Sequence, residues 1–222
     1  MKNKKIFITG TGTDIGKTYI SGLLVKMLKE KGINVAYYKA AMSGNIRDEK
    51  GKLIPGDGKF VKDISGIDQA LDSMCPYVYE NAVSPHLASK IEGNPVNMDV
   101  VKEGFNKLIN QYDFVLCEGS GGILCPINFD NKEIYLEDII KEFEIPCIIV
   151  ADAGLGTINN LVLTYEYMKS KGIQILGIII NNYHPGNIME EDNIFMCQHM
   201  TGLKVIAKVK ENDKKIEMEM EI

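Results

Sequence analysis

The stretch KIFITGTGTDIGKT, residues 5–18, decides the fold. Its first part, Lys5–Thr9, is mostly apolar and predicts a short buried strand. A glycine-rich turn follows and runs directly into a helical pattern, Thr18–Lys31, which ends at Gly32. A turn of this kind between a strand and a helix, closing on Gly-Lys-Thr, is typical of a loop that binds phosphate groups.

Such a loop offers three kinds of contact to a nucleotide. Backbone N–H groups at the helix start face the phosphates, Lys17 adds a positive charge, and Thr18 offers a hydroxyl to Mg2+. The strict pattern has a glycine where this chain has Thr11, and the leading glycine, Gly10, lies one residue further out. The alternative is a glycine-rich turn with a chance Lys-Thr pair. The order of strand, loop and helix favours a nucleotide site.

Beyond this stretch, short apolar runs alternate with longer amphipathic ones. Further strands are predicted at 35–38, 114–117, 147–150 and 175–180, and helices at 60–67, 85–92, 96–112, 136–144 and 158–171. Residues 40–59 are predicted to form a long polar loop, and loops of that length are usually functional. The pattern predicts one α/β domain over residues 1–222, with a doubly wound, mainly parallel sheet of the P-loop NTPase-like type and helices on both faces.

Two charged residues follow predicted strands. Lys39 comes at the end of the second strand, and Glu118 comes at the end of the strand 114–117, before a glycine-rich turn. Ligands in such folds bind beyond the carboxyl ends of the strands, so both side chains are expected in one crevice with the phosphate loop. The alternative for Lys39 is a solvated charge at the rim of the crevice. The alternative for the segment that begins at Glu118 is a plain turn. Asp57 and Asp63 are candidates for a further metal ligand, or for a helix cap or surface charge.

The composition limits the classes of partner and compartment. Hydrophobic residues make up 45% and charged residues 25% of the 222 residues, and the formal net charge is −5. A general attraction to nucleic acid or to an anionic membrane is therefore not expected. The apolar run after Met1–Lys5 is too short for a signal peptide, and no segment is long enough to span a bilayer. The five cysteines are scattered without a C-x-x-C pair, which favours a reducing cytoplasm over disulfides or a zinc site.

The combination of motifs resembles the dethiobiotin synthetases. The shared segments are the phosphate loop, Tyr38-Lys39-x-x-x-Ser43-Gly44, Ser84-Pro85-His86, Glu118–Gly122, Gly154–Asn159 and Asn181-Asn182, in that order. The resemblance covers nearly the whole chain, about residues 4–210. It implies an ATP- and Mg2+-dependent ligase that joins CO2 to 7,8-diaminononanoate and closes the cyclic urea of dethiobiotin. It also implies a homodimer with active sites at the interface.

The resemblance further implies roles for individual residues. Catalysis would use Lys39, Lys17 and Thr13, and Mg2+ would be held by Thr18, Asp57 and Glu118, with Asp57 chosen over Asp63 by alignment. The nucleotide would contact Asp14, Ile15, Gly16, Lys17, Thr18, Tyr19, Asp57, Glu118, Gly119, Ser120, Gly121, Asn181 and Asn182. The diamine would contact Ser43, and its carboxylate would be anchored by Gly154, Leu155, Gly156, Thr157 and Asn159 of a second subunit. Asn181 would read the nucleobase.

Two segments depart from the family pattern. Lys39 is followed by Ala40-Ala41, where the family usually has Pro-Val, and the loss of the proline leaves this loop less restrained. Residues 207–212 lack the proline of the family's adenine-contacting segment. His86 is as consistent with a capping or packing role as with catalysis.

Two other classes share parts of the pattern. Nucleotide-switched ATPases of the partitioning or septum-site type act by binding partners, and they carry a second lysine early in the phosphate loop. This chain has Thr9-Gly10-Thr11 there, which disfavours that interpretation. ATP-dependent amidation enzymes of cobalamin synthesis add a glutamine-handling domain, for which we expect no room in 222 residues.

Overall fold

A computed structural model of the chain describes residues 4–130, 132–220 and 222. Its centre is one sheet in the strand order β10-β9-β8-β1-β5-β2, in which every neighbouring pair is parallel. The strands are β1 (Lys4–Gly10), β2 (Val35–Lys39), β5 (Phe114–Glu118), β8 (Cys147–Asp152), β9 (Ile175–Asn181) and β10 (Val205–Lys208). Two short pairs stand apart from the sheet: β3 (Ala41–Met42) with β4 (Tyr77–Val78), and β6 (Pro126–Phe129) with β7 (Glu133–Tyr135). The predicted doubly wound α/β fold is confirmed.

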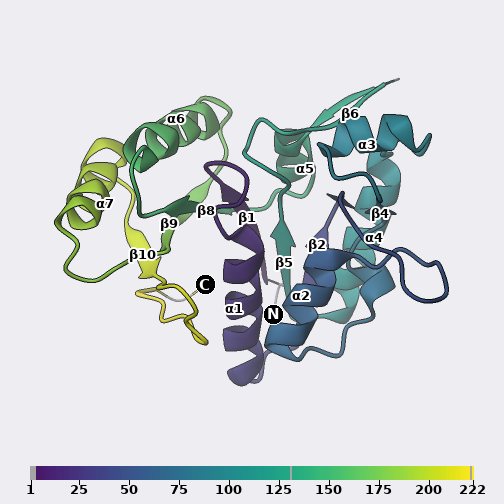
Figure 1. Cartoon of the computed structure of the whole chain (residues 1–222), viewed down its shortest axis with the longest axis horizontal. Coiled ribbons are helices and arrows are strands. Elements are labelled where there is room, and N and C mark those ends of the chain that lie inside the picture. Colours follow the sequence, from purple (N-terminus) through teal and green to yellow (C-terminus); the bar gives the residue numbers. More distant parts are fainter. Residues whose placement is uncertain (1–3, 131, 221) are drawn as a thin grey trace.

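Helices cover both faces of this sheet (Figure 1). They are α1 (Lys17–Glu30), α2 (Gly56–Ser65), α3 (Pro85–Ile91), α4 (Met98–Gln111), α5 (Leu136–Glu142), α6 (Thr157–Ser170) and α7 (Ile188–Thr201). Apolar side chains of α1 and α2 pack on one face with Ile6 and Ile8 of β1. Those of α4 and α5 pack on the other face with Phe7, and α6 and α7 cover β9. In the part of the chain that the structure describes, no helix is long and apolar enough to cross a membrane.

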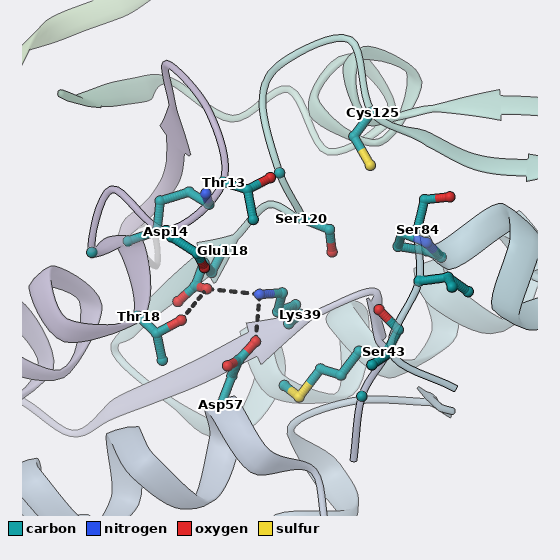
Figure 2. Close-up of a pocket in the computed structure, with 18 of the residues that line it drawn as sticks. Thr13, Asp14, Thr18, Lys39, Ser43, Asp57, Ser84, Glu118, Ser120 and Cys125 are labelled. Atoms are coloured by element: carbon teal, nitrogen blue, oxygen red, sulfur yellow. Dashed lines mark hydrogen bonds and ion pairs between the residues drawn. The ribbon is translucent and has the colours of Figure 1, made fainter. Parts of the chain in front are cut away.

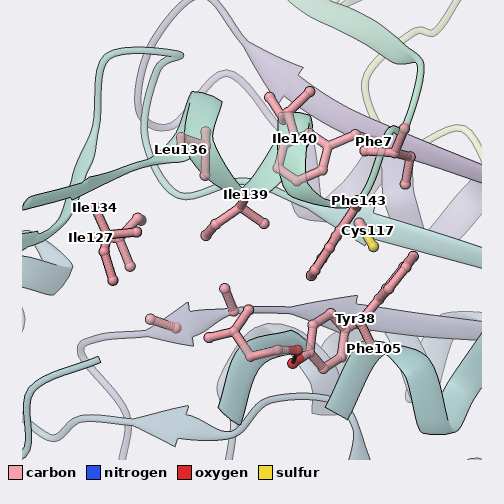
Figure 3. Packing of buried hydrophobic residues seen from close by; sticks show 14 of the residues in the cluster. Phe7, Tyr38, Phe105, Cys117, Ile127, Ile134, Leu136, Ile139, Ile140 and Phe143 are labelled. Atoms are coloured by element: carbon pink, nitrogen blue, oxygen red, sulfur yellow. Dashed lines mark hydrogen bonds between the residues drawn. The ribbon is translucent and has the colours of Figure 1, made fainter. Parts of the chain in front are cut away.

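An aromatic cluster against α4 and α5 fixes the orientation of β2 (Figure 3). The rings of Phe105 and Phe143 stack with centroids 3.9 Å apart, and the ring of Tyr38 lies 6.1 and 6.4 Å from them. The Tyr38 hydroxyl donates to the Val101 carbonyl at 2.6 Å. Side chains alternate along a strand, so this packing turns Tyr37 and Lys39 to the opposite face.

The prediction of a loop through residue 59 was wrong at its end. Helix α2 begins at Gly56, so Asp57 lies in the first turn of a helix. Gly56 and Gly58 have low helix propensity, so the sequence pattern did not predict a helix that begins at Gly56. Tertiary packing explains the choice, because a Cβ at Gly58 would lie only 3.0 Å from the Met74 sulfur. Close approach of the helix to Met74 therefore requires a residue that local propensity disfavours.

Helix α7, strand β10 and the β6–β7 pair were not predicted. Helix α7 buries Ile194 and Cys197, but it exposes Ile188 and Phe195. Its apolar residues therefore form no single stripe at helical spacing, and the helix is defined by packing against α6.

Candidate active site

The register of the sheet brings the predicted site residues together. Lys39 is the register partner of Glu118 where β2 and β5 pair, and Ile8 of β1 is the partner of Glu118 on the other side. The phosphate loop leaves β1 two residues later. The carboxyl ends of β1, β5 and β2 thus place one acidic residue between the phosphate loop and a second lysine.

The phosphate loop is closed by a glycine in a left-handed conformation. Gly16 has φ of 85° and stands directly before α1. A Cβ at Gly16 would lie 2.1 Å from the amide nitrogen of Asn181, at the end of β9. The same amide donates to the Ile15 carbonyl at 3.1 Å. Only glycine therefore fits this turn without displacing Asn181. The hydrogen bond from Asn181 to the Ile15 carbonyl connects the loop to the end of β9.

Lys17 lies folded against its own loop. Its ammonium donates to the Gly12 carbonyl at 2.7 Å, and the residue is only 7% exposed. Burial, and then the positive charge of Lys39, lower the pKa of Lys17 in spite of the nearby Glu118 and Asp57 carboxylates. An anionic phosphate at this point would relieve both unfavourable effects, as a phosphate loop requires.

Lys39 lies between two carboxylates (Figure 2). Its ammonium is 2.6 Å from Asp57 Oδ2 and 2.8 Å from Glu118 Oε1. The lysine and glutamate side chains are almost fully buried, whereas that of Asp57 is 39% exposed. Burial by itself would lower the pKa of Lys39, but the charges of Glu118 and then Asp57 outweigh it and raise the pKa. The two carboxylates therefore favour the charged form of Lys39.

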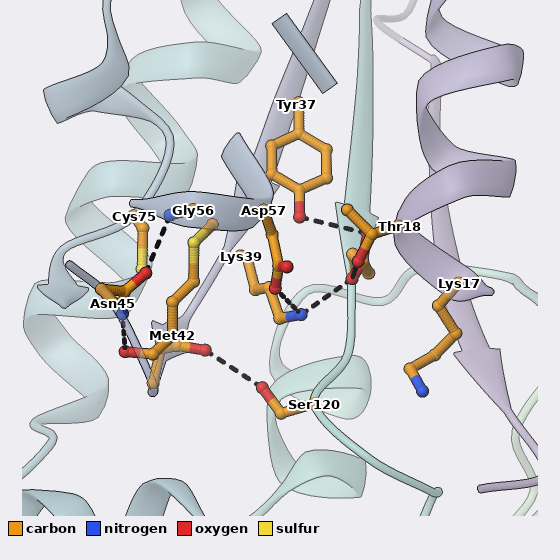
Figure 4. Close-up of polar contacts among 12 residues, drawn as sticks. Lys17, Thr18, Tyr37, Lys39, Met42, Asn45, Gly56, Asp57, Cys75 and Ser120 are labelled. Atoms are coloured by element: carbon orange, nitrogen blue, oxygen red, sulfur yellow. Dashed lines mark hydrogen bonds and ion pairs between the residues drawn. The ribbon is translucent and has the colours of Figure 1, made fainter. Parts of the chain in front are cut away.

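The Glu118 carboxylate accepts hydrogen bonds at both oxygens. Figure 4 labels the three donors, which are Thr18, Lys39 and Tyr37. Thr18 Oγ1 donates to Oε1 at 2.8 Å, the oxygen that Lys39 also contacts, and the Tyr37 hydroxyl donates to Oε2 at 3.1 Å. Burial, and next the charge of Glu118, raise the pKa of Tyr37 well above its usual value, so this hydroxyl stays a donor. Ser120 lies nearby and donates to the Ala41 carbonyl at 3.0 Å.

The oxygen ligands in this cluster fit Mg2+. Thr18 contributes a hydroxyl, and Glu118 and Asp57 contribute one carboxylate each, which are the hard ligands that Mg2+ prefers. Among the described residues there is no group of three or more His, Cys, Asp or Glu that could hold a metal alone. Mg2+ in nucleotide sites commonly uses one or two carboxylates and takes further ligands from phosphates and water.

A cavity of about 810 Å³ opens above this cluster. Of the predicted residues it is lined by Thr13, Asp14, Gly16, Lys17, Thr18, Tyr19, Lys39, Ser43, Asp57, Glu118, Ser120 and Gly121. The opposite wall comes from the segment Ala82–Pro85 and from Cys125 (Figure 2). The volume is in the range of small-molecule sites. The sequence had singled out Ser84 and Pro85 only through the family motif.

Several predicted residues lie away from this cavity. Gly119 is packed against Leu136 and Phe7, since a Cβ there would lie 2.6 and 3.0 Å from them. Asp63 forms an exposed ion pair with Lys59 on the outer side of α2. Of the two aspartates left open by the sequence, only Asp57 is in the cluster with Lys39.

The predicted carboxylate anchor also lies outside the cavity of its own chain. The turn before α6 places Gly156 at φ of 86° and leaves Leu155 88% exposed. Asp152 fixes this turn, because its two carboxylate oxygens accept from the Gly154 N–H at 2.8 Å and from the Asn182 amide at 2.7 Å. Asn182 thus supports the turn instead of lining the cavity. The position is open to another molecule.

Sequence reasoning assigned no role to three residues near the cluster. Met42 and Cys125 line the cavity, and Tyr37 contacts Glu118 from within the core. A tyrosine within an apolar strand predicts only core packing. Alternation along β2 puts Tyr37 on the same face as Lys39 and Tyr38 on the other, but no local signal shows that Glu118 lies within reach of the first face.

The parallel sheet, the glycine-rich loop before α1 and the two lysines define a P-loop nucleotide-binding protein of the α/β class. A family model described as an AAA domain matches residues 4–219. The fold is similar to that in the MinC:MinD cell division protein complex of Aquifex aeolicus, with a TM-score of 0.58 and 13% identity over 95% of this chain and 83% of that one. A likeness at this identity concerns the fold alone.

The sequence relatives are more specific. The ATP-dependent dethiobiotin synthetase BioD of Brachyspira hyodysenteriae is 50% identical over 207 residues, which are 93% of this chain and 91% of that protein. The ATP-dependent dethiobiotin synthetase BioD of Clostridium kluyveri is 46% identical over 219 residues, 96% of this chain and 90% of that protein. The chain belongs to the ATP-dependent dethiobiotin synthetase family, as its motifs had indicated. The partitioning-type ATPase is not favoured.

Proposed function

We propose that this chain, as one P-loop ligase domain over residues 1–222, closes the cyclic urea of dethiobiotin from 7,8-diaminononanoate, CO2 and ATP in biotin biosynthesis. The observation that supports this most is the cluster of Lys39, Asp57, Glu118 and Thr18 beside the phosphate loop. The phosphate loop supplies its own lysine, Lys17, whereas the second lysine, Lys39, lies outside the loop at the end of β2, where it can serve an additional anionic reactant.

The reaction runs in three steps. One amine of the substrate takes up CO2 as a carbamate, and a carbamate oxygen attacks the γ-phosphorus of ATP as ADP leaves. The second amine then attacks the carbonyl carbon of this mixed anhydride, the C–O bond to phosphate breaks, and the ring closes. Lys17 and Lys39 offset charge on opposite sides of the transferred phosphoryl group, and hydroxyls of Thr13 and Ser43 orient its oxygens.

Mg2+ is assigned to Thr18, Asp57 and Glu118. When bound there, it would offset the negative charge of the ATP phosphates. Lys39 holds the same carboxylates in this structure, at 2.6 and 2.8 Å. If these carboxylates held the metal, the Lys39 ammonium would be released from them and would be free to contact the carbamate and the γ-phosphate.

The nucleotide would contact the loop residues Asp14, Ile15, Gly16 and Tyr19, and Ser120 and Gly121 of the facing turn, whereas Gly119 is packed against Leu136 and Phe7. Asn181 marks the base end of the site at the end of β9, and Asn182 acts only indirectly, through Asp152. Asn181 is 3% exposed, and its Oδ1 has no hydrogen-bond partner among the described residues. This acceptor supports our assignment of Asn181 to recognition of an amino group on the base.

The substrate carboxylate is anchored by a second copy of the chain, in a homodimer. Its contacts would be the N–H groups of Leu155, Gly156 and Asn159 at the start of α6, because the N–H of Gly154 is bonded to Asp152 and that of Thr157 to the Gly154 carbonyl. A helix start carries unpaired N–H donors and about half a positive charge, which suits a carboxylate. The buried Thr157 hydroxyl has no partner among the described residues, and Leu155 is 88% exposed.

We assign the enzyme to the cytoplasm, with small molecules as substrates and no nucleic-acid or membrane partner. All five cysteines are free, and four of them are buried. The net charge of −5 disfavours a general attraction to polyanions.

The activity is tested by phosphate release from ATP. We expect release to require 7,8-diaminononanoate and bicarbonate together, because the carbamate is the nucleophile. The measurement compares both additions with each one alone, in the presence of Mg2+. Equal ATP hydrolysis without the diamine would sink the proposal.

The carboxylate anchor is tested with Gly156→Pro. Proline fixes φ near −65° and lacks an N–H, whereas Gly156 has φ of 86°, so the turn loses a donor and its shape. The KM for the diamine should rise strongly, and the KM for ATP should stay nearly constant. The matched control is Gly172→Pro, at φ of 69° beyond the other end of α6. Equal diamine KM values in folded Gly156→Pro and wild type would refute the anchor and leave the ligase assignment intact.

A further inference from the structure

Tyr37 is a buried polar residue that the proposed mechanism leaves without a role. It is fully buried in β2, on the face that α1 and α2 cover. Its hydroxyl donates to Glu118 Oε2 at 3.1 Å. Tyr37 and Lys39 are two residues apart in one strand, so both side chains project from the same face toward the end of β5.

The hydrogen bonds to Glu118 divide into two kinds. Oε1 accepts from Lys39 Nζ and from Thr18 Oγ1, at 2.8 Å each. Both donors have other tasks once the site is loaded, because Thr18 supplies a metal ligand and Lys39 turns to the reactants. Oε2 accepts from Tyr37. Of the three donors, only Tyr37 has no ligand of its own to bind.

The backbone at Tyr37 is held in place by Gln69. Strand β2 is at the edge of the sheet, so its outward N–H and C=O groups have no neighbouring strand. The Gln69 side chain accepts from the Tyr37 N–H at 2.8 Å and donates to the Tyr37 carbonyl at 2.9 Å. Gln69 is itself 2% exposed. The Gln69 side chain thus takes the place of a neighbouring strand at this point. It fixes the backbone of Tyr37, from which the buried ring projects into the core.

We propose that Tyr37 is a positioning residue for the metal site, which holds the Glu118 carboxylate in the orientation that binds Mg2+. The inference rests on the proposed function, since it assumes that Glu118 is a ligand. The hydrogen bond from Tyr37 to Oε2 already restricts the rotation of the Glu118 carboxylate before the metal binds. Less side-chain freedom is then lost on metal binding, which favours the bound state. Donors of this kind around ligating carboxylates commonly contribute about 10–100-fold to metal affinity or activity.

The test is Tyr37→Phe, with Tyr38→Phe as the matched control. Each variant removes one hydroxyl from a buried tyrosine of β2, but the Tyr38 hydroxyl donates to the Val101 carbonyl on the opposite face. Mn2+, which shares the oxygen ligands of Mg2+, is titrated into each protein with a non-hydrolysable ATP analogue, and free Mn2+ is followed by electron paramagnetic resonance. We expect Mn2+ to bind about 10–100-fold more weakly to Tyr37→Phe than to wild type, and Tyr38→Phe to match wild type.

Steady-state kinetics give a second readout. With Tyr37→Phe, the Mg2+ concentration for half-maximal rate should rise, and excess Mg2+ should restore kcat. A purely structural role predicts a loss that Mg2+ does not restore. Equal Mn2+ affinity in Tyr37→Phe and wild type, or equal weakening in both variants, would overturn the inference alone. Absence of Mn2+ binding by the wild-type complex would overturn it together with the assigned metal site.

Discussion

Lys39→Ala is expected to lower kcat by about 10²–10³, the range for loss of one electrostatic stabiliser of a transition state. The KM for ATP should change little, because Lys17 and the loop N–H groups bind the phosphates in the ground state. The measurement is phosphate release at saturating diamine and bicarbonate. Lys39 is buried between two carboxylates, so neither water nor another described lysine at this position replaces its charge.

The same variant has a second expected effect, on stability. Removal of the Lys39 ammonium leaves Glu118 and Asp57 without the cation that neutralises them. Loss of one partner of a buried ion pair typically destabilises the folded protein by about 3–5 kcal/mol. The Asp57 side chain is 39% exposed, so water screens its charge. Asp57 therefore contributes less to this destabilisation than the buried Glu118 does. Mg2+ binds the same carboxylates, and thermal unfolding with and without Mg2+ should show larger stabilisation by the metal in Lys39→Ala than in wild type.

Lys59→Ala is the control for this prediction. Lys59 also pairs with an aspartate, Asp63, but both side chains are more than half exposed on the outer side of α2. Exposed pairs of this kind contribute little, so kcat and stability should remain close to wild type. Near-normal turnover in Lys39→Ala would show that Lys39 is only a structural counter-ion for the two carboxylates.

Gly16→Ala is expected to weaken ATP binding by about 10². The left-handed conformation of Gly16 disfavours a Cβ by about 1–2 kcal/mol. The new methyl group would also lie 2.1 Å from the Asn181 amide, which must move and give up its bond to Ile15, a loss of about 0.5–1.5 kcal/mol. Together these terms are about 1.5–3.5 kcal/mol, and about 1.4 kcal/mol corresponds to a factor of ten. Calorimetric titration with an ATP analogue gives the affinity.

Two variants separate the strain from the collision. Gly32→Ala carries the same kind of backbone strain, at φ of 78°, but a Cβ there meets nothing within 4 Å and lies at the far end of α1. It should lower stability and leave ATP affinity unchanged. Asn181→Ala alone should also weaken ATP binding, through its proposed contact with the base. Adding it to Gly16→Ala should weaken binding by less than the sum of the two single effects, because the colliding amide is then absent. ATP affinity of Gly16→Ala equal to that of wild type would contradict the role assigned to this glycine.

The local features of the site were predictable from the sequence. The phosphate loop is a contiguous segment, and its glycines, Lys17 and Thr18 act through backbone geometry that their own order determines. Lys39 and Glu118 each follow an apolar run, which places them at strand ends. In a parallel sheet those ends share one edge, so an encounter with the loop follows from the fold class.

Strand order and helix docking were not predictable in the same way. No pattern in the sequence specifies that β2 lies beside β5, yet this adjacency puts Lys39 within 2.8 Å of Glu118. Helix α2 starts at Gly56, in spite of the low helix propensity of glycine, because the helix packs closely on Met74. This helix start turns Asp57 toward Lys39 and leaves Asp63 outside the cluster.

The sequence by itself thus determined the fold class, the family and the segments that carry the chemistry, because periodicity and contiguous motifs act over a few residues. Only the tertiary structure decided which of two adjacent tyrosines reaches Glu118 and which asparagine braces the phosphate loop. Tyr37 and Tyr38 are the same residue type in the same strand, and they differ only in the face they occupy. Asn181 is 166 residues from the carbonyl it binds. Contacts of this kind depend on how distant elements pack, and no local pattern records them.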